Sequence, residues 1–174
     1  MPAKSKARAI AFISYSHDDA SHESWVESFA KRLELSDIRV VLDHWSLALG
    51  DSMTHFMESA VRTSDFVLMI CTPEYKRRSD IREFGTGYEA EILATKRLVE
   101  GTSRFIPVLR SGDWLQSLPE WAGGIFGVDL RAEPIEDATF AVLLKHLKTA
   151  ARKSAGSRAS GHNRRKPRTK PDRK

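Results

Sequence analysis

The chain has 174 residues, 41% of them hydrophobic and 29% charged, and a formal net charge of +5. This composition is ordinary for one globular domain with enough material to bury a core. No apolar run approaches the roughly 20 residues that span a bilayer, and the basic N-terminus lacks the apolar region of a secretory signal. The single cysteine, Cys71, excludes an internal disulfide and predicts a cytoplasmic protein with a buried thiol.

The first predicted element is a buried strand over residues 11–14, which ends in the polar run 14–19. Residues 21–35 have apolar side chains at helical spacing, and Ser21 is the expected N-cap of that helix. A β-branched run over 38–43 predicts a second strand that ends at Asp43. A loop with Trp45 and Gly50 follows, and then a helical pattern over 53–64.

The strongest strand signal covers residues 65–72 and ends at Pro73. A charged segment over 74–85 then leads to a second helical pattern over 87–99. A strand over 104–109, a loop-rich segment with a short edge strand at 127–130, and an amphipathic helix over 135–151 complete the series. Strands that alternate with helices predict an α/β fold of the flavodoxin-like type. We expect about five parallel strands, with helices on both faces of the sheet.

The positive charge is concentrated at the C-terminal end. Residues 152–174 contain ten Lys or Arg and one Asp, a net +9, so that residues 1–151 carry −4 of the total of +5. A segment without large apolar side chains cannot offset the entropy lost on ordering. We therefore expect a basic lead over residues 1–9, a folded domain over 10–151 and a disordered basic tail over 152–174. Such a tail is able to bind nucleic acid or an anionic surface weakly through charge.

Polar side chains follow three of the predicted strands at the point where each strand ends. Ser14 and Ser16 follow the first, Asp43 and Trp45 the second, and Thr72 the third, after which Glu89 and Glu91 begin a helix. The carboxyl ends of parallel strands meet at one edge of the sheet, where such folds bind ligands. Hydroxyls, carboxylates and an aromatic ring suit a sugar-and-base ligand.

Several familiar sites are unsupported. The sequence has no GxGxxG or GxxxxGK[ST] motif, and no aspartate ends the third strand as a phospho-receiver would require. A triad drawn from Ser14 or Ser16 with His17 and Asp43 lacks a nucleophile-elbow pattern. We expect no metal site, because the spacing of the histidines does not suit metal ligands; this holds for His17, His22, His44 and His55. We also expect no resident cofactor.

Four segments in order resemble the successive motif regions of TIR domains, in a bacterial variant similar to SEFIR domains. They are "AFISYSHDD", "VVLDHWSLALGD", "DFVLMICTPEY" and "REFGTGYEAEIL", within residues 10–109. The resemblance implies a five-stranded parallel flavodoxin-like fold. Many TIR domains cleave the nicotinamide–ribose bond of NAD+ and release nicotinamide with ADP-ribose or a cyclic product, whereas others act only as signalling adaptors through contacts between copies.

The resemblance places the catalytic glutamate at the start of the helix after the third strand, where two registers compete. The SEFIR-like pattern, with glutamate directly after GxGY, selects Glu89 and puts Tyr88 in the site. The TIR pattern selects Glu91, although Gly87 then replaces the expected aromatic residue. The longer local match, "FGTGYE", favours Glu89. By the same resemblance Phe12, Ser14 and Ser16 would line the base of the pocket, and Asp43 and Trp45 would close over NAD+; Trp45 is equally suited to an assembly surface.

One carboxylate is enough to cleave the nicotinamide–ribose bond of NAD+. Cleavage of the bond to nicotinamide passes through an oxocarbenium-like transition state, and the leaving group departs neutral, so that no acid has to protonate it. A glutamate near the ribose stabilises the developing positive charge. The expected function is therefore an NAD+ glycohydrolase that is activated by self-assembly in bacterial immune signalling, with NAD+ as substrate and a separate sensor or effector protein as a further partner. The alternative is a non-enzymatic adaptor, and a third interpretation has the tail recruit nucleic acid.

Overall fold

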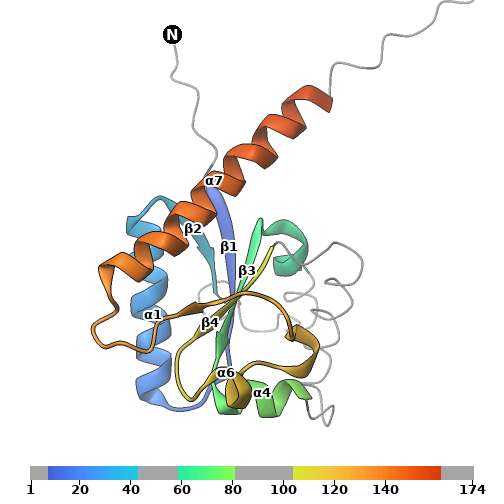
Figure 1. Cartoon of the computed structure of the whole chain (residues 1–174). Helices are drawn as coiled ribbons and strands as arrows, with labels where there is room; N and C mark the ends of the chain where they lie inside the picture. The colour runs from blue at the N-terminus through green and yellow to red at the C-terminus, as the bar shows by residue number, and fades with distance from the viewer. Residues whose placement is uncertain (1–7, 43–58, 81–103, 162–174) are drawn as a thin grey trace, which may run out of the picture.

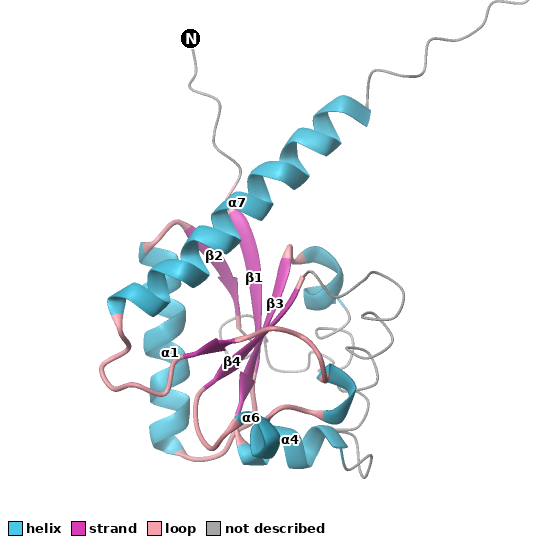
Figure 2. Cartoon of the chain, viewed as in Figure 1, coloured by secondary structure: helices cyan, strands magenta, loops and turns pink. Residues whose placement is uncertain are grey.

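The computed structural model describes residues 8–42, 59–80 and 104–161 of the chain. Figure 1 shows a central sheet with helices on its two faces, and Figure 2 separates the helices from the strands. The strands are β1 (Ala9–Ser14), β2 (Ile38–Val41), β3 (Phe66–Cys71), β4 (Phe105–Leu109) and β5 (Val128–Asp129). The helices are α1 (Ala20–Leu35), α4 (Pro73–Asp80), α6 (Trp114–Ser117), the 3-10 helix η1 (Glu120–Ala122) and α7 (Asp137–Gly161).

The five strands form one all-parallel sheet in the order β2-β1-β3-β4-β5. The flavodoxin-like α/β fold predicted from the sequence is thus confirmed. The register aligns Ser14 at the end of β1 with Met69 of β3, and Cys71 at the end of β3 with Leu109 of β4. All strands therefore end at one edge of the sheet, which we call the carboxyl edge; the opposite one is the amino edge.

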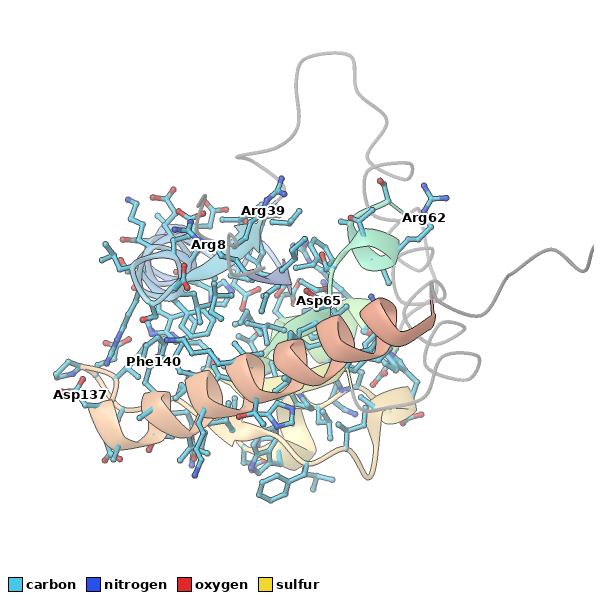
Figure 3. The ribbon with its side chains drawn as sticks, turned by 90° about the horizontal axis from the view of Figure 1, so that it is seen from above. Arg8, Arg39, Arg62, Asp65, Asp137 and Phe140 are labelled. Carbon is cyan, nitrogen blue, oxygen red and sulfur yellow. The ribbon has the colours of Figure 1, made fainter. Side chains whose placement is uncertain are left out.

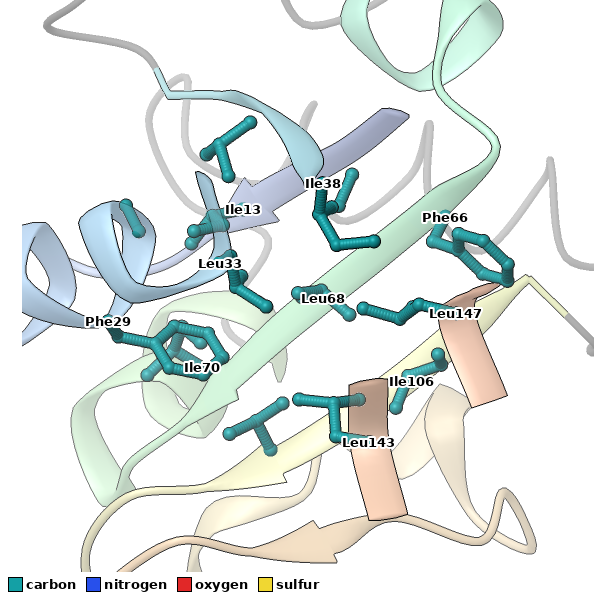
Figure 4. Packing of buried hydrophobic residues seen from close by; sticks show 14 of the residues in the cluster. Ile13, Phe29, Leu33, Ile38, Phe66, Leu68, Ile70, Ile106, Leu143 and Leu147 are labelled. Atoms are coloured by element: carbon teal, nitrogen blue, oxygen red, sulfur yellow. The ribbon is translucent and has the colours of Figure 1, made fainter. Parts of the chain in front are cut away.

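Strand β3 lies at the centre of the sheet, and its alternate side chains fill two separate cores. Phe66, Leu68 and Ile70 pack with α1 and α7 on one face, which Figure 4 shows from close by. Val67, Met69 and Cys71 point to the other face. All six residues are at most 3% exposed. The continuous apolar run is explained by this position, because a strand covered on both faces has no polar side.

The N-cap of α1 is Asp19, and the prediction of Ser21 was wrong. Asp19 has extended backbone angles, and its Oδ1 accepts a hydrogen bond of 2.8 Å from the backbone N–H of His22. Asp and Ser are about equally good caps, and here the helix begins at Ala20, so that its N-cap lies two residues earlier than predicted. Ser21 consequently falls inside the first turn, where its hydroxyl cannot cap.

The charged segment after β3 begins with a helix, α4, where the sequence pattern predicted only a connection. Thr72 Oγ1 accepts a hydrogen bond of 3.0 Å from the backbone N–H of Tyr75 and so caps the helix. Pro73 occupies the first position, where its missing N–H costs nothing. Glu74 binds Arg77 and Arg78, three and four residues further on, at 2.7 Å each. The low hydrophobicity of the segment hid a helix that is held by its cap and its ion pairs.

Helix α7 extends further than expected, through Gly161. Residues 152–161, assigned to a disordered tail from composition, continue the helix. Their Ala, Lys, Arg and Ser residues have adequate helix propensity, and the preceding turns are anchored in the core by Phe140, Leu143 and Leu147. A helix that is already nucleated by packing adds further residues at little cost. Among the helices of the described ranges, none has the length and apolar character needed to cross a bilayer.

Candidate functional site

Four hydroxyl side chains meet at the carboxyl edge between β1 and β3. The Oγ of Ser14 lies 2.9 Å from the Oη of Tyr75, and the Oγ of Ser16 lies 3.4 Å from Oγ1 of Thr72. All four side chains are buried, with exposures between 1% and 7%. We call these residues, Ser14, Ser16, Thr72 and Tyr75, the hydroxyl cluster.

The fold places each member of the cluster for a simple reason. Side chains alternate along a strand, so that Ser14 shares a face of the sheet with Phe12, whose ring packs in the same core as Tyr75. Ser16 follows in the loop and donates a hydrogen bond to Oδ1 of Asp18. Thr72 is fixed by capping α4, and the same first turn directs Tyr75 back toward β1. Two strand ends and one helix start thus build the cluster.

Two titratable side chains near the cluster, Glu74 and Cys71, have shifted pKa values. Hydrogen bonds from Arg77 and Arg78 hold the pKa of Glu74, in the first turn of α4, down at about 2. Burial raises the pKa of Cys71 to about 12. The Cys71 thiol is therefore protonated at neutral pH and is not a nucleophile, as its predicted burial implied. The cluster itself consists of neutral hydroxyls, each of which can donate and accept hydrogen bonds but carries no charge.

The structure brings together the site residues predicted on β1 and in the loop directly after it. Ser14 and Ser16 belong to the hydroxyl cluster, and Phe12 is 1% exposed in the core directly beneath it. Asp43, Trp45, Tyr88, Glu89 and Glu91 lie outside the described residues, so their places in a pocket stay predictions. Leu42, the residue before Asp43, is buried in the core on the α1 side of the sheet.

Sequence reasoning missed Tyr75. The available signal was a helix-start pattern. Thr72 supplies a capping hydroxyl, Pro73 suits the first helical position, and the aromatic Tyr75 follows two residues after the proline. That pattern marks a helix start, and here the third helical residue, Tyr75, reaches Ser14 at the end of β1. The run of charges after Tyr75 concealed the pattern.

The two histidines near β1 in the described residues have local roles. The Nδ1 of His17 lies 2.9 Å from Oε1 of Glu23 on the surface. His22 is buried on α1, and burial lowers its pKa, so that it is neutral at physiological pH. Within residues 8–42, 59–80 and 104–161, no group of three or more His, Cys, Asp or Glu side chains could hold a metal ion.

The buried contact between Ser14 and Tyr75 predicts a coupled effect on stability. Tyr75→Phe or Ser14→Ala leaves a buried hydroxyl without this partner and should lower the free energy of unfolding by about 1–3 kcal/mol. The double substitution should cost less than the sum, because both groups then disappear together. Urea unfolding of the four chains measures the coupling. Ser24→Ala, at an exposed position on α1, is the matched control, and additive effects would contradict the contact.

A parallel five-stranded sheet with helices on both faces and a polar cluster at its carboxyl edge defines a flavodoxin-like α/β domain of the TIR and SEFIR type. A sequence model of the TIR domain matches residues 11–144, most of the chain, and the chain therefore belongs to the TIR domain family. None of the curated proteins compared with it gives a significant match.

Solved structures give the same result. A prokaryotic SEFIR domain is 28% identical and superposes with a TM-score of 0.68 over 80% of this chain and 98% of its own. The TIR domains of the activated Roq1 resistosome, which directly recognizes the pathogen effector XopQ, are 17% identical, with a TM-score of 0.58 over 79% and 98%. The TIR domain of the Toll-related receptor TRR-2 from Hydra magnipapillata is 13% identical, with a TM-score of 0.58 over 79% and 97%. The last two show the fold alone.

Proposed function

We propose that this TIR domain is an NAD+ glycohydrolase, which cleaves the nicotinamide–ribose bond and releases nicotinamide with ADP-ribose or a cyclic product. The observation that carries the proposal is the hydroxyl cluster. It lies at the carboxyl edge between β1 and β3, in a fold class that binds nucleotides at this edge. Membership of the TIR domain family supports the same assignment.

The chemistry divides between the cluster and a glutamate. The hydroxyls of Ser14 and Ser16 hydrogen-bond polar groups of the dinucleotide and fix its position, because neighbouring side chains hold each of them. The carboxylate, Glu89 in the favoured register, stabilises positive charge on the ribose as the bond to nicotinamide lengthens. Nicotinamide leaves as a neutral molecule, and water or a group of the substrate itself then captures the ribosyl carbon.

Self-assembly is the proposed switch, with a separate sensor or effector protein as the source of the signal in bacterial immune defence. TIR domains commonly associate with one another, and this chain offers surface for such contacts. Phe126 before β5 is 96% exposed and Leu115 on α6 is 85% exposed. Contact with another copy would remove the apolar surface of these side chains from water. They equally support the second candidate function, a non-enzymatic adaptor that signals through contacts between copies.

Turnover of NAD+ by the purified full chain distinguishes the two functions. We expect nicotinamide, followed by HPLC, to rise more steeply than in proportion to protein concentration, because assembly activates the site. The same separation identifies ADP-ribose or its cyclic form. A chain that releases no nicotinamide even when it is fused to an oligomeric carrier would contradict the proposal and favour the adaptor.

A further inference from the structure

Helix α7 leaves the body of the domain at the amino edge, opposite the hydroxyl cluster. Its first turns pack in the core through Phe140, Leu143 and Leu147, whereas Lys148 and Thr149 are exposed. The helix then continues to Gly161, and Figure 1 shows this part projecting past the sheet. We call residues 148–161 the helical extension.

The sequence of the extension has no apolar side with which it could dock. Residues 148–174 contain no aliphatic residue larger than alanine apart from proline, and no aromatic residue other than one histidine. The extension contains four Lys or Arg residues and no Asp or Glu, a net charge of +4. A helix without an apolar stripe is not held by packing on its own domain. Its chemistry suits a partner with dense negative charge.

The amino edge also carries arginines. Arg39 and Arg62 lie toward the face of the sheet opposite α7, because Ile38 and Val40 pack on the α7 side and Ala60 and Val61 pack in the other core. Arg8 directly precedes β1, Arg39 is the second residue of β2, and Arg62 lies in the helical turn before β3; all three are exposed, and Figure 3 views them from above. Arg8 pairs with Asp37 at 2.6 Å.

Two carboxylates at the amino edge already have partners within the domain. Asp65 accepts a hydrogen bond of 2.9 Å from the backbone N–H of Ile10, and Asp37 is paired with Arg8. Glu34 is exposed near the end of α1. Among the residues that the structure describes, no ion pair joins Arg39 or Arg62 to a carboxylate, and both side chains are exposed.

We propose that the helical extension of α7 together with Arg39 and Arg62 forms one surface that binds the phosphate backbone of nucleic acid. Guanidinium groups bind phosphate oxygens in a bidentate manner, and an array of them neutralises successive phosphates without reading the bases. An anionic membrane fits less well, because helices that lie on bilayers insert Trp, Phe or Leu side chains and the extension has none. The surface lies at the edge opposite the hydroxyl cluster, so bound nucleic acid leaves the cluster accessible.

Fluorescence anisotropy with the full chain tests the proposal. The probes are a short labelled DNA duplex of mixed sequence and a labelled single-stranded RNA of the same length, each titrated at several KCl concentrations. The logarithm of the binding constant should fall linearly with the logarithm of the salt concentration, by about 0.9 per phosphate contact on the duplex and about 0.7 on the single strand. Binding to either nucleic acid supports the proposal.

Two sets of substitutions locate the surface. Arg39→Ser with Arg62→Ser should reduce the slope on the duplex by about 2, one unit for each lost contact. Arg152→Ser, Lys153→Ser and Arg158→Ser, made together, should reduce it by about 3. The matched control is Lys31→Ser with Arg77→Ser, which removes two exposed positive charges from α1 and α4 and should leave the slope unchanged.

Three results would overturn the proposal. The first is that neither nucleic acid binds at physiological salt, including the case in which only vesicles of phosphatidylserine and phosphatidylcholine bind. The second is an unchanged slope for the Arg39 and Arg62 double variant, which would remove the amino edge from the surface. The third is an equal loss of slope in the Lys31 and Arg77 control, which would mean that net charge alone matters. None of these readouts depends on NAD+ turnover.

Discussion

Glu89→Ala is expected to lower nicotinamide release from NAD+ by a factor on the order of a hundred to a thousand. Alanine removes the negative charge that stabilises the developing cation on the ribose, while the neutral leaving group still needs no acid. Glu89→Gln retains the size and hydrogen-bonding capacity of the side chain but not its charge, and it should lose nearly as much activity. The measurement is the initial rate of nicotinamide release at saturating NAD+, followed by HPLC at one protein concentration.

Two matched substitutions control this experiment. Glu91→Ala changes the competing glutamate and should retain most of the activity. Glu34→Ala changes an exposed glutamate at the C-terminal end of α1, near the amino edge, and should have no effect. Loss in the Glu91 variant alone would move the catalytic role to that residue. Activity in both the Glu89 and the Glu91 variant would contradict the site assignment, provided that light scattering shows unchanged self-association.

The fold was predictable because its core depends on a pattern that the sequence displays directly. Strand β3 is a continuous apolar run, since it is buried on both faces, and the alternation of such runs with helical patterns predicts the parallel sheet. The end of each element was less predictable. Whether Asp19 or Ser21 caps α1 depends on backbone angles at one residue, and both side chains are suitable. The C-terminal end of α7 was equally hard to predict, because the length of this helix depends on packing earlier in the helix.

The candidate site was predictable in part for a related reason. Ser14 and Ser16 follow a strand, so topology alone places them at the carboxyl edge. Tyr75 could be placed only by recognising α4, a helix held by a cap and by ion pairs that hydrophobic periodicity does not show. For the catalytic glutamate the order of motifs leaves two registers, which select Glu89 or Glu91, and the substitutions above decide between these two residues.

Leu68→Ala is expected to lower the free energy of unfolding by about 2–5 kcal/mol. Leu68 is fully buried at the middle of β3, where it packs between the sheet and the helices α1 and α7 (Figure 4). Removing most of its side chain loses the hydrophobic transfer energy of the deleted carbons and leaves a cavity that the surrounding strands cannot fill. The loss is measured as a shift of the urea midpoint with an unchanged slope, monitored by circular dichroism.

The matched control is Leu35→Ala, the same substitution at the last residue of α1, where the side chain is 90% exposed. It should change the free energy of unfolding by no more than about 0.5 kcal/mol. A Leu68 variant as stable as this control would mean that β3 is not the centre of the core. Comparison of Leu68→Ala with Glu89→Ala separates an effect on stability from an effect on NAD+ turnover. The Leu68 variant should lose stability while its folded fraction keeps the carboxyl edge intact, whereas the Glu89 variant should unfold at the wild-type urea concentration and lack turnover.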